Sequence, residues 1–259
     1  MASPTYATKA LVLRRTKLGE SDVICTLLAE NGSQIRAVAK GARKPTSSFS
    51  SRLELGACCD LLVATGKSLD IIKEARLIES NGFIREDIDY LSAASPLFEL
   101  LDRGVEVGQT NPRLFALSLA ALSTLSVTDR DHILSVTAAH LLKTLSLLGF
   151  RPSFDTCIGC GDLPAEDDRS PWGFSVIDGG VVCPRCRRSY EVVFPDERII
   201  RWSQVLLYST FDDIRKFEMD NELSLDILRL AQQLIRAHLS FDMKSLQFLF
   251  VNARRDDPV

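Results

Sequence analysis

The sequence predicts an α+β protein: an N-terminal five-stranded barrel, a helical domain, and a four-cysteine ribbon inserted between helical parts. Short β-branched and apolar runs fill the first eighty residues, helical spacing of apolar residues begins after Ile84, and two CxxC pairs interrupt that spacing. We therefore expect four parts: a barrel over 1–80, helices over 81–150, a ribbon over 151–195, and C-terminal helices over 196–259 that pack with the first helices.

Five short segments in the first part have the length and composition of strands. They are residues 8–15, 22–30, 33–40, 53–64 and 69–78. Asn31-Gly32 predicts a tight hairpin between the second and third, because both residue types tolerate positive φ. Five antiparallel strands in so short a stretch favour a small closed barrel, either an OB-fold or an SH3-like barrel.

After Ile84 the apolar residues recur three and four positions apart, which is the helical period. The expected helices cover 86–108, 111–126, 130–149, 202–218 and 222–240. Asn111 and Asp129 are expected N-caps, Gly149 is expected to close its helix, and Pro96 to kink or split the first one. Residues 253–259 are expected to form a frayed tail.

The cysteines divide into two groups. Cys25, Cys58 and Cys59 lie in apolar runs and are expected to be small buried hydrophobes. The other four form CIGC and CPRC, namely Cys157, Cys160, Cys183 and Cys186, with 22 residues between the pairs. Four thiolates can enclose one Zn²⁺ tetrahedrally, and the segment 172–183 is typical of a strand, turn and strand that would bring the pairs together. A single redox CxxC normally opens a helix beside a βαβ unit, which this sequence lacks. We therefore expect one structural zinc, with no open coordination position for catalysis.

Charge is unevenly distributed along the chain. The formal net charge is −3, yet residues 1–80 hold twelve Lys and Arg against eight Asp and Glu. Seven of these cations are candidates for a phosphate-binding groove: Arg14, Arg15, Arg36, Lys40, Arg43, Lys44 and Arg52. Only Tyr6 and Phe49 supply aromatic rings there for base stacking. From the residues alone, the cations fit either a DNA-binding surface or an ordinary solvated one.

No known catalytic motif is present: the sequence has no Walker-type loop, GxGxxG, HExxH or GxSxG. His140 lies on an apolar helical face and is expected to be a packed core residue. The chain also lacks a signal-peptide pattern and any long apolar run, so we expect a cytoplasmic protein without a membrane segment. These features indicate a binding protein without catalytic residues.

Several motifs resemble the RecO family of bacterial DNA repair proteins. The resemblance includes ALVLRR and GESD near the start, AKGARK at 39–44, IIKEARLIES, NPRLFALSLAAL, and LLGFRPSFDTCIGCG followed by GGVVCPRC. It covers most of the chain and is weakest beyond Pro195.

The resemblance implies an OB-fold, a helical domain and a zinc ribbon, and a recombination mediator at the nucleoid. Such a mediator binds single- and double-stranded DNA, anneals complementary strands, pairs with RecR, interacts with single-strand-binding protein, and is linked to RecA and RecF. It also implies that AKGARK is a basic loop at the DNA-binding face. The alternatives are a zinc-ribbon nuclease, a ligase accessory subunit and a transcription-associated DNA-binding factor.

Overall fold

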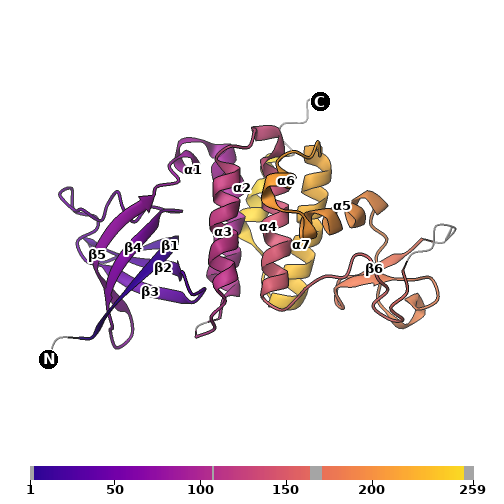
Figure 1. Ribbon diagram of the computed structural model, residues 1–259, viewed down its shortest axis with the longest axis horizontal. Coiled ribbons are helices and arrows are strands. Elements are labelled where there is room, and N and C mark those ends of the chain that lie inside the picture. The colour runs from indigo at the N-terminus through magenta and orange to yellow at the C-terminus, as the bar shows by residue number, and fades with distance from the viewer. Residues whose placement is uncertain (1–2, 107, 164–170, 254–259) are drawn as a thin grey trace. The chain divides into compact units, whose positions relative to one another are not determined.

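The computed structural model describes residues 3–106, 108–163 and 171–253. The chain divides into two compact units, Met1–Ser126 and Val127–Val259. Each unit is described by itself below, and Figure 1 labels the elements of both. None of the helices in the described residues is long and apolar enough to cross a bilayer.

The first unit contains a closed barrel of five strands, as the sequence predicts. These are β1 (Thr5–Leu18), β2 (Asp22–Ala29), β3 (Gln34–Ala39), β4 (Cys58–Ala64) and β5 (Asp70–Glu79), in the order β1-β2-β3-β5-β4. β4 pairs with β1 to close the ring, and β3–β5 is the parallel pair among otherwise antiparallel neighbours. This crossover order is that of the OB-fold, a five-stranded Greek-key barrel.

Alternating side chains of the strands fill the barrel interior. Ala10 and Val12 of β1, Cys25 and Leu27 of β2, and Cys59 of β4 are among its fully buried members. The prediction that the three non-CxxC cysteines are small buried hydrophobes is confirmed, since Cys58 is buried as well. Burial raises the pKa of Cys25 to about 11 and that of Cys59 to about 12, so both are neutral packing groups.

The hairpin between β2 and β3 forms at the predicted place, with a longer turn than a two-residue one. Residues 30–33 connect the strands, the Asn31 carboxamide accepts hydrogen bonds from Ser33, and Gly32 adopts φ +80°. A side chain at Gly32 would also collide with the backbone of Asn111. Glycine is therefore required there both by conformation and by packing.

Three helices complete the first unit: α1 (Phe83–Glu86), α2 (Ile88–Gly104) and α3 (Pro112–Leu125). The expected helix 86–108 begins two residues late, because the Asp87 side chain caps Asp89 N–H. α2 continues through the buried Pro96, so of the two alternatives expected there, a kink or a split, the split does not occur. Asn111 caps α3 as predicted, with Pro112 in the first turn. α2 packs on the outer face of β1 and β2.

In the second unit α4 (Ile133–Leu147) is the central helix, and most of its residues are buried. It packs against α5 (Glu197–Tyr208), α6 (Phe211–Ile214) and α7 (Asn221–Leu239), and α8 (Lys244–Ala253) packs on α7. Buried residues on all sides of α4 are typical of a helix in the centre of a helical unit. Gly149 follows α4 with φ +98°, as expected for a helix C-terminus.

Two sequence predictions for the second unit were wrong, and one helix was not predicted. The single helix expected over 202–218 is two helices, because the Thr210 hydroxyl accepts Asp213 N–H and starts α6. Asp129 makes no side-chain cap; it precedes a short 3-10 turn over Arg130–His132. α8 was missed entirely. The predicted tail, 253–259, begins at the last residue of α8, and its remaining residues lie outside the described residues.

Candidate metal centre and nucleic-acid interface

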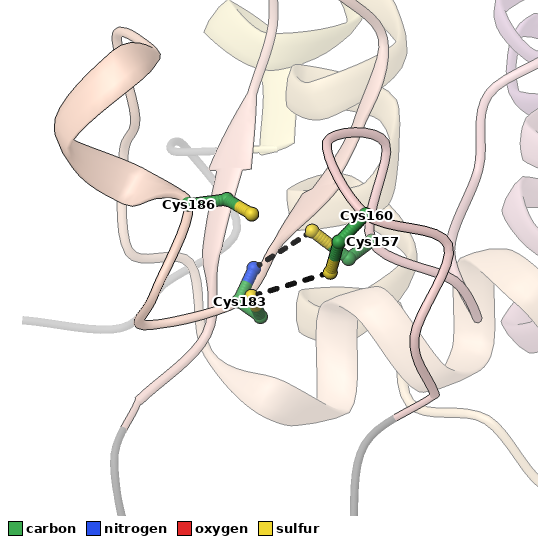
Figure 2. A group of neighbouring side chains, drawn as sticks. All are labelled: Cys157, Cys160, Cys183 and Cys186. Carbon is green, nitrogen blue, oxygen red and sulfur yellow. Dashed lines mark hydrogen bonds between the residues drawn. The ribbon is translucent and has the colours of Figure 1, made fainter.

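The two CxxC pairs converge in the second unit (Figure 2). The Sγ atoms of Cys157, Cys160, Cys183 and Cys186 all lie within 4.8 Å of one another. The two sulfur atoms of Cys160 and Cys183 are 3.8 Å apart. A tetrahedron of Zn–S bonds of about 2.3 Å has edges of about 3.8 Å, so this spacing fits a tetrathiolate site.

A two-stranded hairpin brings the pairs together, as the sequence predicts. β6 (Gly173–Ser175) and β7 (Gly180–Val182) pair antiparallel, and the second CxxC pair begins directly after β7. The first pair is tied to the same strand, because Ile158 N–H donates to the carbonyl of Val181 at 3.0 Å. Gly159 lies against Cys186, where a Cβ would come within 3.0 Å of the Cys186 Cβ.

Backbone N–H groups surround the Cys157 sulfur. Burial alone would raise the pKa of this thiol, but N–H groups of Cys183, Cys160 and Gly159 outweigh it and lower the pKa to about 6. The Cys183 N–H lies 3.3 Å from the sulfur. Desolvation and hydrogen bonds with the other three thiols raise the pKa of Cys160 to about 12. A bound cation would remove this conflict between neighbouring thiolates, so the donor set fits a soft divalent metal ion.

The basic turn, defined as Lys40–Lys44, follows β3 in the first unit. Its backbone reverses at Gly41, which has φ +65°. Gly41 N–H donates to Asp22 Oδ1 at 2.7 Å, and Arg43 N–H donates to the carbonyl of Ser21 at 2.9 Å. The basic turn is therefore anchored to the β1–β2 turn rather than being a free loop.

Asp22 contributes charge as well as hydrogen bonds to this arrangement. The Gly41 N–H, the Ser21 hydroxyl, and the charges of Lys40 and Lys44 lower the pKa of its carboxyl. Lys40, Arg43 and Lys44 are all exposed. The sequence reasoning did not single out Asp22, although it is the last residue of the GESD motif and the first residue of β2.

The other four predicted DNA-binding cations have identifiable protein partners or neighbours. Arg14, Thr26 and Arg36 form a row across β1, β2 and β3, and Arg14 Nε contacts Asp102 of α2 at 3.0 Å. Burial raises the pKa of Asp102, and the nearby charge of Arg14, the Thr26 hydroxyl and the charge of Arg36 oppose that rise. Arg15 pairs with Glu54.

Arg52 donates from Nη1 to the carbonyl of Ala75 at 3.0 Å, on β5. Arg14, Arg15 and Arg52 therefore also hold parts of the barrel unit together, and Arg43 of the basic turn donates from Nη1 to the carbonyl of Gly19 at 3.2 Å. No local pattern in the sequence indicates these long-range partners.

Two side chains of α4, the buried His140 and the half-buried Lys143, were considered in the sequence analysis or lie in its predicted helix 130–149. His140 is fully buried, as expected for a core residue, and burial lowers its pKa to about 3. Lys143, the one lysine or arginine of the expected helix 130–149 beyond its first position, donates from Nζ to the carbonyls of Leu207 and Ser209 at 2.8 and 2.7 Å. Lys143 is thus engaged by the end of α5.

The fold and the two candidate sites define an OB-fold protein with a helical body and a four-cysteine metal-type centre. Two family models match nearly the whole chain: Recombination protein O N terminal over residues 1–81 and Recombination protein O C terminal over residues 85–247. The chain belongs to the RecO family of DNA repair and recombination proteins.

Relatives named DNA repair protein RecO agree with this assignment. The protein of Frankia casuarinae is 39% identical over 186 residues, covering 71% of this chain and 74% of the relative. That of Nocardioides sp. is 38% identical over 185 residues, covering 70% and 74%. That of Symbiobacterium thermophilum is 31% identical over 248 residues, covering 94% and 96%.

Proposed function

We propose that this protein is a recombination mediator that binds single- and double-stranded DNA and anneals complementary strands. In this proposal it acts with RecR and single-strand-binding protein to load RecA, is linked to RecF, and works in the cytoplasm at the nucleoid. The observation that carries the proposal is the basic turn: three exposed cations, anchored through Asp22, on an OB-type barrel of a RecO-family chain.

Annealing needs no covalent catalysis. Lys40, Arg43 and Lys44 would neutralise phosphates and release counterions, which lowers the repulsion between two strands. Base pairing between the strands supplies the sequence specificity, because phosphate contacts carry none. The protein contributes electrostatics and proximity, so its proposed activity requires no catalytic residue.

The four-part division gives each part a role in the proposal. The barrel of residues 1–80 binds DNA, and the helices of 81–150 and 196–259 provide surfaces for protein partners. The ribbon of 151–195 holds one structural Zn²⁺ through Cys157, Cys160, Cys183 and Cys186, which is supported by the spacing of their sulfur atoms. When bound, the ion would cross-link two knuckles and would supply no chemistry at DNA.

The basic turn tests the proposal. Lys40, Arg43 and Lys44 are changed together to Gln, and the control changes Arg201, Arg215 and Lys216, three exposed cations of the second unit, to Gln. Fluorescence anisotropy with a labelled single strand and a strand-annealing assay are run at low salt. We expect the basic-turn variant to bind about tenfold or more weakly and to anneal slowly, while the control resembles the wild type.

Three results would contradict the proposal. The first is that the wild-type protein fails to bind single-stranded DNA at low salt. The second is that the two triple variants bind it equally well. The third is cleavage of the labelled strand in the presence of Mg²⁺, which would favour the nuclease alternative.

A further inference from the structure

A groove of about 490 Å³ lies on the outer side of the barrel, between the segment after the basic turn and the strands β4 and β5. This size lies in the range of about 300–1,000 Å³ typical of small-molecule sites. Its lining combines one aromatic ring, apolar side chains, three cations and two carboxylates: Ser48, Phe49, Arg52, Asp60, Leu61, Leu62, Lys73, Glu74, Ala75 and Arg76. β5 lies on the side of the barrel away from α2 (Figure 1).

The groove exists because β5 extends beyond the end of its pairing with β3. β3 pairs with β5 at Asp70 and Ile71, and the ladder stops there while β5 runs on to Glu79. Beyond that point the segment 48–52 lies beside β5, and the Arg52 guanidinium donates to the carbonyl of Ala75. A strand that loses its ladder partner leaves room for side chains and ligands along its free edge.

The wall of the groove is held in place before any ligand arrives. Phe49 is half-buried and packs against the barrel core. The Cys59 thiol donates to the carbonyl of Arg52 at 3.0 Å, which fixes the backbone that follows Phe49. A preorganised wall reduces the ordering cost of binding.

The balance of charge in the groove is positive. Asp60 stands between Lys9 and Arg76 in the strand register, so its carboxylate has a cation on each side. Lys73 is exposed at a bulge between β4 and β5, and Arg52 is exposed at the opposite wall. Among the lining residues, Arg52, Lys73 and Arg76 outnumber Asp60 and Glu74.

An aromatic ring beside cations is the combination that binds single-stranded nucleic acid, because the ring stacks on a base and the cations contact phosphates. We propose that this groove binds one nucleotide of a single strand, with its base against Phe49 and Leu62 and its phosphates near Lys73 and Arg76. The basic turn ends four residues before Ser48, so one strand can follow the chain from the turn into the groove. The inference rests on the proposed DNA-binding function and adds to it a base-stacking site that discriminates single strands from duplex.

The stacking contact is tested by removing each side of it in turn. Phe49→Leu keeps an apolar residue at the core, and the probe is a labelled oligothymidine with or without abasic sites. We expect Phe49→Leu to weaken binding of the intact strand by about 5- to 20-fold, the lower part of the range for one stacked base. The abasic strand should bind wild type more weakly than the intact one does, and Phe49→Leu should weaken its binding little further.

The phosphate contact is tested without touching the core. Lys73→Glu is compared with Arg113→Glu, which makes the same charge change at an exposed residue of α3 in the same unit. We expect Lys73→Glu to weaken single-strand binding at least about fivefold relative to Arg113→Glu. Melting temperatures of all variants check that the fold is retained.

The possible failures are distinct. The groove is not a nucleotide site if Phe49→Leu discriminates the abasic strand as wild type does and Lys73→Glu binds single strands as tightly as Arg113→Glu. If the basic-turn variant loses binding in the same experiments, the proposed function stands. If Phe49→Leu melts early, Lys73→Glu alone decides the matter. If wild type binds no single strand at all, the proposed function and the groove fail together.

Discussion

His140 is the residue whose burial has the clearest measurable consequence. Its ring lies inside the second unit with the Thr144 hydroxyl 3.5 Å from its nitrogens, and burial lowers the pKa to about 3 from an ordinary value near 6.5. Between these two pH values the unfolded chain binds a proton that the folded chain does not. Stability should therefore fall as pH decreases through this window.

A pH series of urea unfolding measures this effect. One such proton changes the free energy of unfolding by about 1.4 kcal/mol per pH unit, so acidification from pH 6.5 to 5 should cost roughly 2 kcal/mol. His140→Gln should reduce this pH dependence, whereas His238→Gln, which removes a half-buried histidine stacked on Phe150, should retain it. Equal pH dependence in His140→Gln and wild type would show that His140 is not the group responsible.

Single residues also mark the limit of sequence reasoning. A burial pattern identified His140 and the core cysteines, because the apolar character of their neighbours is visible in the sequence. The partners of Arg14 and Lys143 were not predictable, since Asp102 and the carbonyls of Leu207 and Ser209 are more than sixty positions away. Such pairs depend on the packing of whole elements, which local pattern does not specify.

The ribbon is the element whose stability should depend most on a ligand. Its two strands have three residues each, and the fully buried members of the cluster around them are Cys157, Val182 and Cys183, with half-buried side chains such as Ile158 and Trp172 packed against them. So small a core contributes little, and structural zinc normally supplies much of the folding free energy of such modules. We expect Cys157→Ser with Cys160→Ser to abolish zinc binding and lower the melting temperature.

Metal analysis and calorimetry of the purified protein test this expectation, and Cys25→Ser serves as a control that alters a cysteine of the barrel. Chelation should destabilise wild type and Cys25→Ser, and leave the double variant unaffected. Retention of one zinc per chain in the double variant, with unchanged melting, would overturn the assignment of these cysteines as ligands.

At the scale of elements, accuracy varied within both classes: α3 and α7 lie within a residue of their predicted bounds, whereas β4 begins five residues after its predicted start and β1 extends three residues further at each end. β2, β3 and β5 begin within a residue of their predicted starts, and the Asn31-Gly32 turn marks the start of β3. The break at Thr210 and the helix α8 were missed, since a cap inside a continuous apolar pattern and a short helix near the chain end give weak periodic signals. The groove could not be predicted either, because it depends on where the β3–β5 ladder stops.

The distribution of charge over the whole molecule determines how DNA binding should respond to salt. The chain is acidic overall, with a net charge of −3, but its first eighty residues are net positive. A local cationic field attracts phosphate even when the total charge is negative, and the acidic remainder opposes binding elsewhere. The number of released counterions should therefore follow the barrel cations and not the total count of Lys and Arg.

For single strands, the logarithm of the binding constant falls with the logarithm of salt concentration with a slope of about −0.7 per neutralised phosphate. If each cation of the basic turn contacts one phosphate, changing Lys40, Arg43 and Lys44 to Gln should make the slope less steep by about 2. The control at Arg201, Arg215 and Lys216 should leave the slope unchanged, because these residues belong to the other unit. A titration from low to moderate salt, fitted for wild type and both triple variants, measures these slopes. Equal slopes for wild type and the basic-turn variant would mean that the turn is a solvated surface and that phosphate contacts lie elsewhere.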